Sequence, residues 1–564
     1  MKKRKMLLLM VTAVLIVATA LSGCSKSTND PNSGSTKTSP TPGTTTNAEE
    51  GESSDIWEFG SSELSFSAFQ LYNWQDFPAT MDDNPFWKYL KENKKLNIKS
   101  VLGSSNNLQL MATMMANDNL PDLIHGDRNH PDFLKLYKEG KLVALDDYME
   151  KYPNLKKWLS SEAADLLRSP DGKLYQFPNY YTTIPNGAAG YVVNKKIYKE
   201  LGSPSLETMD DLYAYLVKVK EKYGNEIVPF EPDQAANANG IGLIYTGHKE
   251  NSYYRSLSSG TIAVVDDANN KLSSLYTDPA FRESQKFVSK LYREKLISQD
   301  MFTAVDRAGI QERVLTGRVA IYAASSPLTW AMQGDTELSA KDPDAGYFVT
   351  WPIHKAGLDK NKIFTGSWDK LGWNVNVITT AAEEPEKIFA WLDWMTGPEG
   401  MATQYFGPEG GNWNGFDEND RPIFTDTYNK AEVAKLETDN VPVIIVGNTT
   451  YIDPIKMDYE MAKPEAERSW LLTNQEAVTW RTTNDATALA TNLTPQAGTD
   501  LADIDVNVRE IFAQALSASA TAKSDADVDK ILDQAQEDSL AVGYGELLEW
   551  RTEQWLKNKE LLGE

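Results

Sequence analysis

The stretch NNLQLMATMMANDNLPDLIHGD, from Asn106 to Asp127, decides the fold that we expect for this chain. Leucine and methionine side chains recur at helical spacing over 106–117, which predicts an amphipathic helix. Pro121 ends this pattern, because proline cannot continue a helix. Residues 122–125 then predict a short strand, and a polar loop follows. The stretch therefore supplies one helix and one strand to an α/β sheet.

The residues before this stretch complete a repeating pattern of strands and helices. We expect strands over 64–71 and 96–102, with a helix between them. This alternation favours an open sheet with right-handed parallel crossovers. Ligands of such sheets bind outside the carboxyl ends of the strands. Asn73, Trp74 and Asp127 are therefore expected near one cleft.

The size and charge of the chain narrow the possible functions. Its 564 residues are enough for two or more domains. The formal net charge is -24, and a surface this acidic argues against a nucleic-acid partner, since phosphates attract lysine and arginine. We attribute the charge to solubility. With a single cysteine, no disulfide can form within the chain.

The beginning of the sequence has the features of an export signal. A basic start is followed by the apolar run Met6–Leu21, which is shorter than the roughly 20 residues that span a bilayer. Leu21-Ser22-Gly23-Cys24 resembles a bacterial lipobox, in which the thiol is diacylated and the chain is cut before it. Two acyl chains would anchor the protein stably, whereas one alone is marginal. A plain signal peptide and a short membrane span are the alternatives.

Two further stretches carry a resemblance to a known family. Residues 194–221 read NKKIYKELGSPSLETMDDLYAYLVKVKE, and residues 385–413 read PEKIFAWLDWMTGPEGMATQYFGPEGGNW. Together with 106–127 they resemble extracellular solute-binding protein family 1, the substrate-binding lipoproteins of ABC importers, and in particular the large oligosaccharide type of Gram-positive bacteria. The resemblance implies a two-lobe, periplasmic-binding-protein-like α/β fold of type II. It also implies mostly parallel sheets with helices on both faces, a hinge between the lobes and a helical C-terminal part.

The resemblance and the composition together suggest how the chain is divided. The lobes are expected to close by bending near 190–193 and 372–376. The expected segments are a lipoprotein signal peptide (1–23), a disordered Ser/Thr/Pro-rich tether (24–55), the first lobe (56–190), the second lobe (191–371), a return to the first lobe (372–440) and a mainly helical C-terminal part that completes the second lobe (441–564).

Candidate ligand-binding residues are aromatic side chains that stand beside hydrogen-bonding ones in expected loops. An aromatic ring can cover the apolar C–H face of a sugar while polar groups bind its hydroxyls. Packing in the core is the alternative for each of these tryptophans. The family resemblance supports Trp74, Asp127, Trp330 and Trp413 best. The full set is Asn73, Trp74, Asp76, Asp127, Tyr180, Tyr181, Ser326, Trp330, Trp368, Asp369, Trp373, Asn412 and Trp413.

Signatures of enzymes and metal sites are missing from the sequence. None of the four histidines forms an i, i+4 pair, and the chain has no HExxH, GxSxG or Walker A motif. We therefore expect no catalytic residue, no metal and no cofactor. A pair of carboxylates facing each other across a cleft stays open, because sequence spacing does not reveal it.

The function that we expect is that of a monomeric, membrane-anchored solute-binding protein on the extracellular face of a Gram-positive cell membrane. It would bind an oligosaccharide or related carbohydrate between its lobes and deliver it to the permease subunits of an ABC importer. Two alternatives remain at this point. One is a surface-anchored polysaccharide-active enzyme, a hydrolase or lyase, and the other is a sensory sugar-binding lipoprotein.

Overall fold

The computed structural model describes residues 56–564, with the exception of 73–76, 104–105, 235–238, 259–260, 304–306, 441–444 and 497. The expected signal peptide, Cys24 and the expected tether lie outside the described residues. The described part belongs to one compact unit, Ile56–Glu564. None of its described helices is long and apolar enough to cross a membrane.

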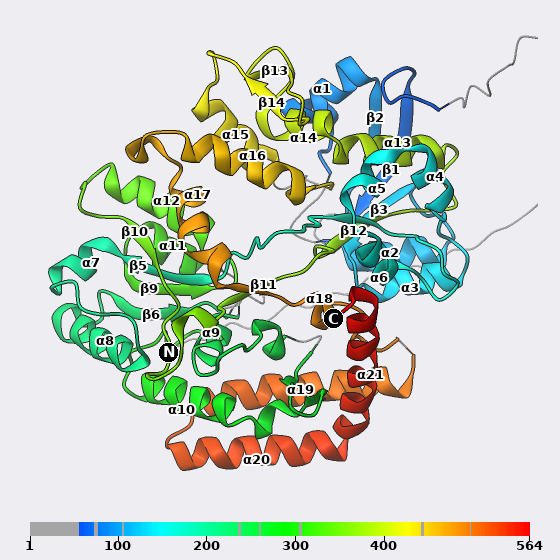
Figure 1. Cartoon of the computed structure of the whole chain (residues 1–564). Helices are drawn as coiled ribbons and strands as arrows, with labels where there is room; N and C mark the ends of the chain where they lie inside the picture. Colours follow the sequence, from blue (N-terminus) through cyan, green and yellow to red (C-terminus); the bar gives the residue numbers. More distant parts are fainter. Residues whose placement is uncertain are drawn as a thin grey trace, which may run out of the picture. The chain divides into compact units, whose positions relative to one another are not determined.

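The first lobe is built on a five-stranded sheet (Figure 1). Strands β1, β2 and β3 pair in parallel, as the alternation of strands and helices predicts. Strand β12 is antiparallel to both of its neighbours, β3 and β4. Four of the five strands therefore run in one direction, and β12 runs against them. In spatial order the strands are β2 (Leu96–Val101), β1 (Leu64–Gln70), β3 (Leu123–Asp127), β12 (Asn374–Ile378) and β4 (Phe177–Asn179).

The second lobe is built on a four-stranded sheet with one strand of opposite direction. Strands β6 and β9 pair in parallel, while β5 is antiparallel to both β9 and β10. All five residues of β5 are buried, and it lies between two other strands. The order is β10 (Tyr347–Thr350), β5 (Gly190–Asn194), β9 (Val319–Ala324) and β6 (Val228–Pro232).

Helices surround each sheet. Those of the first lobe are α1 (Pro85–Lys94), α2 (Asn107–Ala116), α3 (Pro131–Lys138), α4 (Asp146–Lys151), α5 (Pro153–Trp158), α6 (Ser161–Leu167), α13 (Pro385–Thr396), α14 (Pro398–Phe406), α15 (Lys430–Asn440) and α16 (Thr449–Met461). Those of the second lobe are α7 (Lys195–Glu200), α8 (Met209–Tyr223), α9 (Ile241–Thr246), α10 (Pro279–Arg293), α11 (Ala308–Leu315), α12 (Leu328–Ser339) and α17 (Trp470–Asn474).

The remaining elements are the C-terminal helices and three small two-stranded sheets. The helices, whose presence the sequence predicted, are α18 (Thr487–Ala490), α19 (Asp500–Ala520), α20 (Asp525–Ala541) and α21 (Tyr544–Leu562) (Figure 1). The small sheets pair β7 (Val264–Asp266) with β8 (Lys271–Ser273), β11 (Gly366–Trp368) with β15 (Thr483–Asp485), and β13 (Trp413–Phe416) with β14 (Pro422–Phe424).

The helix and strand predicted within 106–127 are both present. Helix α2 buries Met111 and Met114 against the first sheet, while Leu108 at its start is half exposed. The side-chain amide of Asn107 donates to the carbonyls of Gln70 (2.8 Å) and Tyr72 (2.7 Å). The start of α2 is thereby fixed to the end of β1, where ligands of such sheets bind.

Each sheet has an apolar core of its own. The first-lobe core includes Trp391 and Trp413, and the second-lobe core includes Leu216 and Ile321. Ile452, in α16, also packs in the first core, so the chain still contributes to the first lobe beyond residue 440. Apolar burial of this extent is the main force that stabilises each lobe.

Candidate functional site

Three aromatic side chains cluster at the carboxyl edge of the first sheet. The rings of Tyr72 and Trp373 are 5.3 Å apart between centroids, and those of Tyr180 and Trp373 are 6.3 Å apart and nearly parallel, at 12°. Trp373 is 39% exposed, which is high for so large an apolar ring. We call Tyr72, Trp373 and Tyr180 the aromatic platform.

The strands of the first sheet place the platform. Tyr72 follows the carboxyl end of β1, Tyr180 follows that of β4, and Trp373 precedes the antiparallel strand β12. All three positions therefore belong to the same edge of the sheet. Tyr180 adopts a left-handed backbone with φ of 57°, which is uncommon for a bulky residue and marks local strain.

Gly372 permits this close arrangement. Its φ is 67°, and a Cβ added there would lie 1.9 Å from the carbonyl oxygen of Asn179. Only glycine fits both the left-handed backbone and the close approach. The chain entering β12 can therefore pass directly against the chain leaving β4, which brings Trp373 beside Tyr180.

A buried histidine supports Tyr72 from within the sheet. The rings of Tyr72 and His125 are 5.9 Å apart in an edge contact. Nδ1 of His125 lies 3.0 Å from Oδ1 of Asn376, and Nε2 lies 3.0 Å from Nδ2 of Asn374. Because the Asn376 oxygen accepts and the Asn374 amide donates, these contacts suit an imidazole protonated at Nδ1 alone. Burial accordingly lowers the pKa of His125 to about 4.

The buried imidazole gives the first lobe a defined sensitivity to acid. The folded-state pKa lies below the unfolded value near 6.5, so the unfolded chain binds the proton first as the pH falls. Between pH 7 and pH 4.5, His125 should lower the free energy of unfolding by about 2–3 kcal/mol. Urea unfolding of the wild type and of His125→Gln at both pH values measures this term. Parallel pH dependence in the two proteins would refute it.

The polar rim of the platform contains Asp127. Its Oδ1 accepts from the backbone N–H of Asn129 at 2.8 Å, which shapes the turn after β3. Burial, and then the negative charge of Asp127, raises the pKa of Tyr72 well above its usual range. The buried Tyr72 hydroxyl is thus neutral at any physiological pH. The carboxylate of Asp127 beside aromatic faces suits hydroxyl-bearing ligands.

A second aromatic group lies at the carboxyl edge of the second sheet. Trp330 in α12 lies 6.1 Å from Tyr322 of β9 between ring centroids, at 21°, and the Arg307 guanidinium carbon is 4.2 Å from the Trp330 centroid. Nη2 of Arg307 is 2.6 Å from Oδ2 of Asp233, a fully buried carboxylate just after β6. This ion pair holds Arg307 against the tryptophan, an arrangement favourable for cation–π attraction.

The connections between the lobes join these two edges. Residues 180–189 run from the end of β4 to the start of β5, and Gly190 of β5 pairs with Ala324, the last residue of β9. The connecting segment therefore leaves the carboxyl edge of one sheet and arrives at the carboxyl edge of the parallel strands of the other. Its length limits the separation of the two ends to about 40 Å.

This route also changes the location of the expected hinge. Residues 190–193 belong to β5 and 374–376 belong to β12, and both strands are central and fully buried. Bending there would break ladder hydrogen bonds on both sides of the strand. The segments before these strands, 180–189 and 369–373, contain no named helix or strand.

The structure separates the predicted ligand-binding residues into several groups. Asn73, Trp74 and Asp76 lie outside the described residues. Asp127, Tyr180 and Trp373 come together at the first-lobe platform, whereas Ser326 and Trp330 belong to the second-lobe edge. Ser326 is exposed, in the turn between β9 and α12.

Three of the predicted residues are core residues, and we withdraw them from the site. Trp413 is wholly buried and donates from Nε1 to the carbonyl of Gly407 at 2.7 Å. The amide of Asn412 donates to Phe406, and the hydroxyl of Tyr181 is 2.5 Å from Oγ1 of Thr396. Asn412 is 4% exposed and Tyr181 1%. Side chains this enclosed have no surface left for a ligand.

Trp368 and Asp369 occupy the connection between the lobes. Trp368 ends β11, whose partner β15 belongs to the C-terminal part of the chain, and it is half-buried. Asp369 is 7% exposed and binds arginines from both lobes, at 3.3 Å (Arg128) and 2.9 Å (Arg255). Asp369 is therefore a buried charge whose partners come from both lobes.

Sequence reasoning missed Tyr72, Arg307 and Asp233. Tyr72 directly precedes the predicted Asn73, so its place after a strand was a usable signal. Arg307 and Asp233 are 74 positions apart and belong to no recognisable motif. Only the tertiary structure reveals that they meet, with Nε of Arg307 donating to Oδ2 of Asp233 at 2.8 Å.

A cavity borders this site on the side of Arg128. It has a volume of about 540 Å³, and its lining includes Arg128, Tyr137, Tyr175 and Trp550. None of the predicted ligand-binding residues that the structure describes lines it. Within the described ranges, no three histidine, cysteine or acidic side chains are grouped so as to hold a metal ion.

Comparison with known proteins identifies the family of this chain. Residues 66–402 match the family of bacterial extracellular solute-binding proteins, and the chain belongs to that family. The expected family membership is thus confirmed. The chain is 24% identical over 225 residues to the melibiose/raffinose/stachyose-binding protein MelE of Bacillus subtilis. That match covers 38% of this chain and 45% of MelE, less than half the length of the relative.

Solved structures confirm the expected two-lobe α/β fold. The alginate-binding protein AlgQ2, in its form without calcium ion, matches with a TM-score of 0.66 at 19% identity, over 89% of this chain and 99% of its own. The EF-hand mutant of FusA of S. pneumoniae, in complex with fructo-nystose, matches with a TM-score of 0.65 at 16% identity, over 88% of this chain and 100% of its own. The N-glycan transport protein NgtS of Streptococcus pneumoniae matches with a TM-score of 0.58 at 17% identity, over 88% and 99%. At these identities the likeness concerns the fold alone.

Proposed function

We propose that this solute-binding protein takes up an oligosaccharide between its two lobes and presents it to the permease of an ABC importer. The observation that carries the proposal is the exposed Trp373, held between Tyr72 and Tyr180 at the carboxyl edge of the first sheet. An aromatic face with a polar rim suits the apolar face and the hydroxyls of a sugar ring. Relatives whose names record sugar ligands, MelE among them, support the same ligand class.

The second lobe would supply the opposite wall of the site. Arg307 offers guanidinium donors next to Trp330, and Ser326 offers an exposed hydroxyl in the neighbouring turn. Binding to both edges would favour a closed arrangement over an open one, because the ligand contacts both lobes only when they approach. The connecting segments 180–189 and 369–373 would bend.

Location and assembly belong to the same proposal. Cys24 would carry a diacylglycerol anchor after cleavage, and the Ser/Thr/Pro-rich stretch to residue 55 would serve as a tether. The protein would act as a monomer on the outer face of the cell membrane, in a Gram-positive cell. The permease subunits would be its protein partners, and it would need no cofactor.

Thermal unfolding and tryptophan fluorescence of the purified protein test the proposal. The panel is raffinose, stachyose, kestose, fructo-nystose, Man5GlcNAc and an alginate oligosaccharide. A ligand that binds only the folded state raises the melting temperature by mass action. We expect at least one of these sugars to give a saturable rise, together with a change in fluorescence and full recovery of the sugar.

Each other outcome counts against a named part of the proposal. Recovery of the sugar in pieces would contradict a binding role in favour of a polysaccharide-active enzyme. No response to any member of the panel would contradict the carbohydrate assignment. Binding without loss of sugar uptake in cells that lack the protein would contradict delivery to a permease and favour a sensory role.

A further inference from the structure

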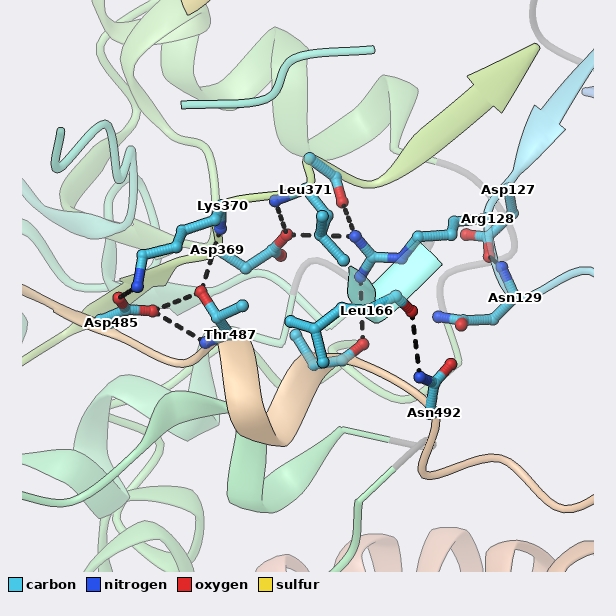
Figure 2. A network of polar contacts seen from close by, with 12 residues as sticks. Asp127, Arg128, Asn129, Leu166, Asp369, Lys370, Leu371, Asp485, Thr487 and Asn492 are labelled. Atoms are coloured by element: carbon cyan, nitrogen blue, oxygen red, sulfur yellow. Dashed lines mark hydrogen bonds and ion pairs between the residues drawn. The ribbon is translucent and has the colours of Figure 1, made fainter. Parts of the chain in front are cut away.

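The first element of the inference is a buried ion pair beneath the platform. Nη1 of Arg128 lies 3.3 Å from Oδ1 of Asp369, and their side chains are 5% and 4% exposed. Arg128 follows directly after β3, and Figure 2 shows its guanidinium pointing toward Asp369. Charges buried this deeply persist only when they are paired and hydrogen-bonded.

Arg128 also fixes the backbone that carries Trp373. Its own N–H donates to the carbonyl of Trp373 at 3.1 Å, and its Nη1 donates to the carbonyl of Gly372 at 2.5 Å. The N–H of Leu371 donates to Oδ1 of Asp369 at 3.2 Å and closes the turn before them. The carbonyls of Gly372 and Trp373, just before β12, are therefore both bound by Arg128. Asp369 in turn orients the Arg128 guanidinium.

The other oxygen of Asp369 binds the second lobe. Nη2 of Arg255 lies 2.9 Å from Oδ2 of Asp369. Arg255 belongs to the helical turn Tyr254–Leu257, where Tyr254 packs against the second-lobe core. A single carboxylate thus joins an arginine of the first lobe to an arginine of the second, at the segment that would bend.

The adjacent residue ties the same segment to the C-terminal part of the chain. The N–H of Lys370 donates to Oγ1 of Thr487 at 3.0 Å, and its ammonium is 3.4 Å from the carboxylate of Asp485 (Figure 2). The polar contacts of residues 369–372 therefore reach the first lobe, the second lobe and the C-terminal part. Movement of any of these parts relative to the others would strain or break at least one of these contacts.

We infer that Asp369 couples the position of the Trp373 side chain to the second lobe, through Arg255 on one side and Arg128 on the other. The three residues are positioning residues and make no contact with the ligand themselves. The role of Trp373 as a ligand contact rests on the proposed function, whereas the coupling rests on the contacts above. Removal of Arg255 should release Trp373 even in the absence of a sugar.

Arg255 offers the cleanest variant, because its side chain is 32% exposed and Asp369 would keep Arg128 as a partner. The protein is labelled with 5-fluorotryptophan, and the fluorine resonance of Trp373 is assigned by its absence in Trp373→Phe. We expect Arg255→Gln to shift or broaden that resonance and Arg255→Lys to restore it. Arg293→Gln is the matched control, since Arg293 is 28% exposed and pairs with Asp525 at 2.8 Å, away from this segment.

The binding measurement separates coupling from function. Arg255→Gln should weaken binding of raffinose or kestose by at most about tenfold, the limit reached if the whole free energy of the lost charge-assisted hydrogen bond goes into the displacement of Trp373. An unchanged Trp373 resonance in Arg255→Gln, or an equal change in Arg293→Gln, would overturn the inference. A changed resonance with wild-type affinity would confirm the coupling and contradict the role of Trp373 as a ligand contact. If the wild type binds neither sugar, the proposed function fails for these ligands, and the fluorine resonances alone still decide the coupling.

Discussion

Replacement of Trp373 by alanine is expected to weaken sugar binding by about 30- to 1000-fold, which corresponds to roughly 2–4 kcal/mol for a buried aromatic anchor. The ring would be covered by the ligand in the complex and is 39% exposed without it. Its removal takes away the largest apolar face of the platform and leaves Tyr72 and Tyr180 without their shared neighbour. Isothermal titration with a sugar that binds the wild type measures the loss.

Two comparisons make this result specific. Trp373→Phe keeps an aromatic face and should recover part of the affinity, whereas Trp351→Ala, at a half-buried tryptophan outside both aromatic edges, should bind as the wild type does. Ligand-free Trp373→Ala should melt below the wild type, because most of the side chain is buried, so the titration is run well below that melting temperature. An affinity loss of less than threefold in Trp373→Ala would remove Trp373 from the site.

Replacement of Arg551 by methionine is expected to lower the free energy of unfolding by about 3–5 kcal/mol. The Arg551 side chain is fully buried, and its Nη2 lies 2.6 Å from Oδ1 of Asp505. Nε donates to the carbonyl of Leu493 at 3.1 Å, and Nη1 donates to that of Thr261 at 2.9 Å. Methionine fills much of the volume but leaves these buried oxygens without their donor, which costs their full desolvation.

The same carboxylate supplies a control for this prediction. Nη2 of Arg509 also binds Asp505, at 2.5 Å, but Arg509 is 37% exposed and lies one helical turn away in α19. Arg509→Met should therefore cost no more than about 1 kcal/mol. Urea unfolding of both variants and the wild type gives the comparison. Equal losses in the free energy of unfolding of the two variants would show that Arg551 does not contribute more than Arg509 to the packing of α21 on α19.

The elements of the first lobe were predictable because their signals are local. Helix α2 and strand β3 follow from apolar spacing and from Pro121, and they lie within two residues of their expected limits. The direction of β12 was not predictable in this way. A strand that returns from another lobe has the same apolar residues whether it pairs parallel or antiparallel.

The site was predictable only in part, since the loops around buried and exposed tryptophans have similar compositions. Trp413 follows a Gly-rich loop with Asn412, as a ligand-binding tryptophan would, yet the loop folds back so that Gly407 accepts its N–H. Trp373 follows a glycine too, and there Gly372 turns the ring outward beside Tyr180. Contacts between residues far apart in the sequence decide whether such a tryptophan is buried or exposed. The local sequence around the tryptophan does not reveal these contacts.

Gly372 restricts how the proposed binding site can diversify. Any side chain at that position would collide with the carbonyl of Asn179. A mutation of Gly372 would therefore abolish the placement of Trp373 beside Tyr180 and would not merely alter it. Around it, Trp373 is exposed and Tyr72 and Tyr180 are partly buried, so changes of ring size are expected to be tolerated best at Trp373. A library for altered sugar preference should therefore randomise these three positions and keep Gly372 constant. Natural divergence toward new ligands is expected to follow the same rule, with substitutions at the three aromatic positions and none at Gly372.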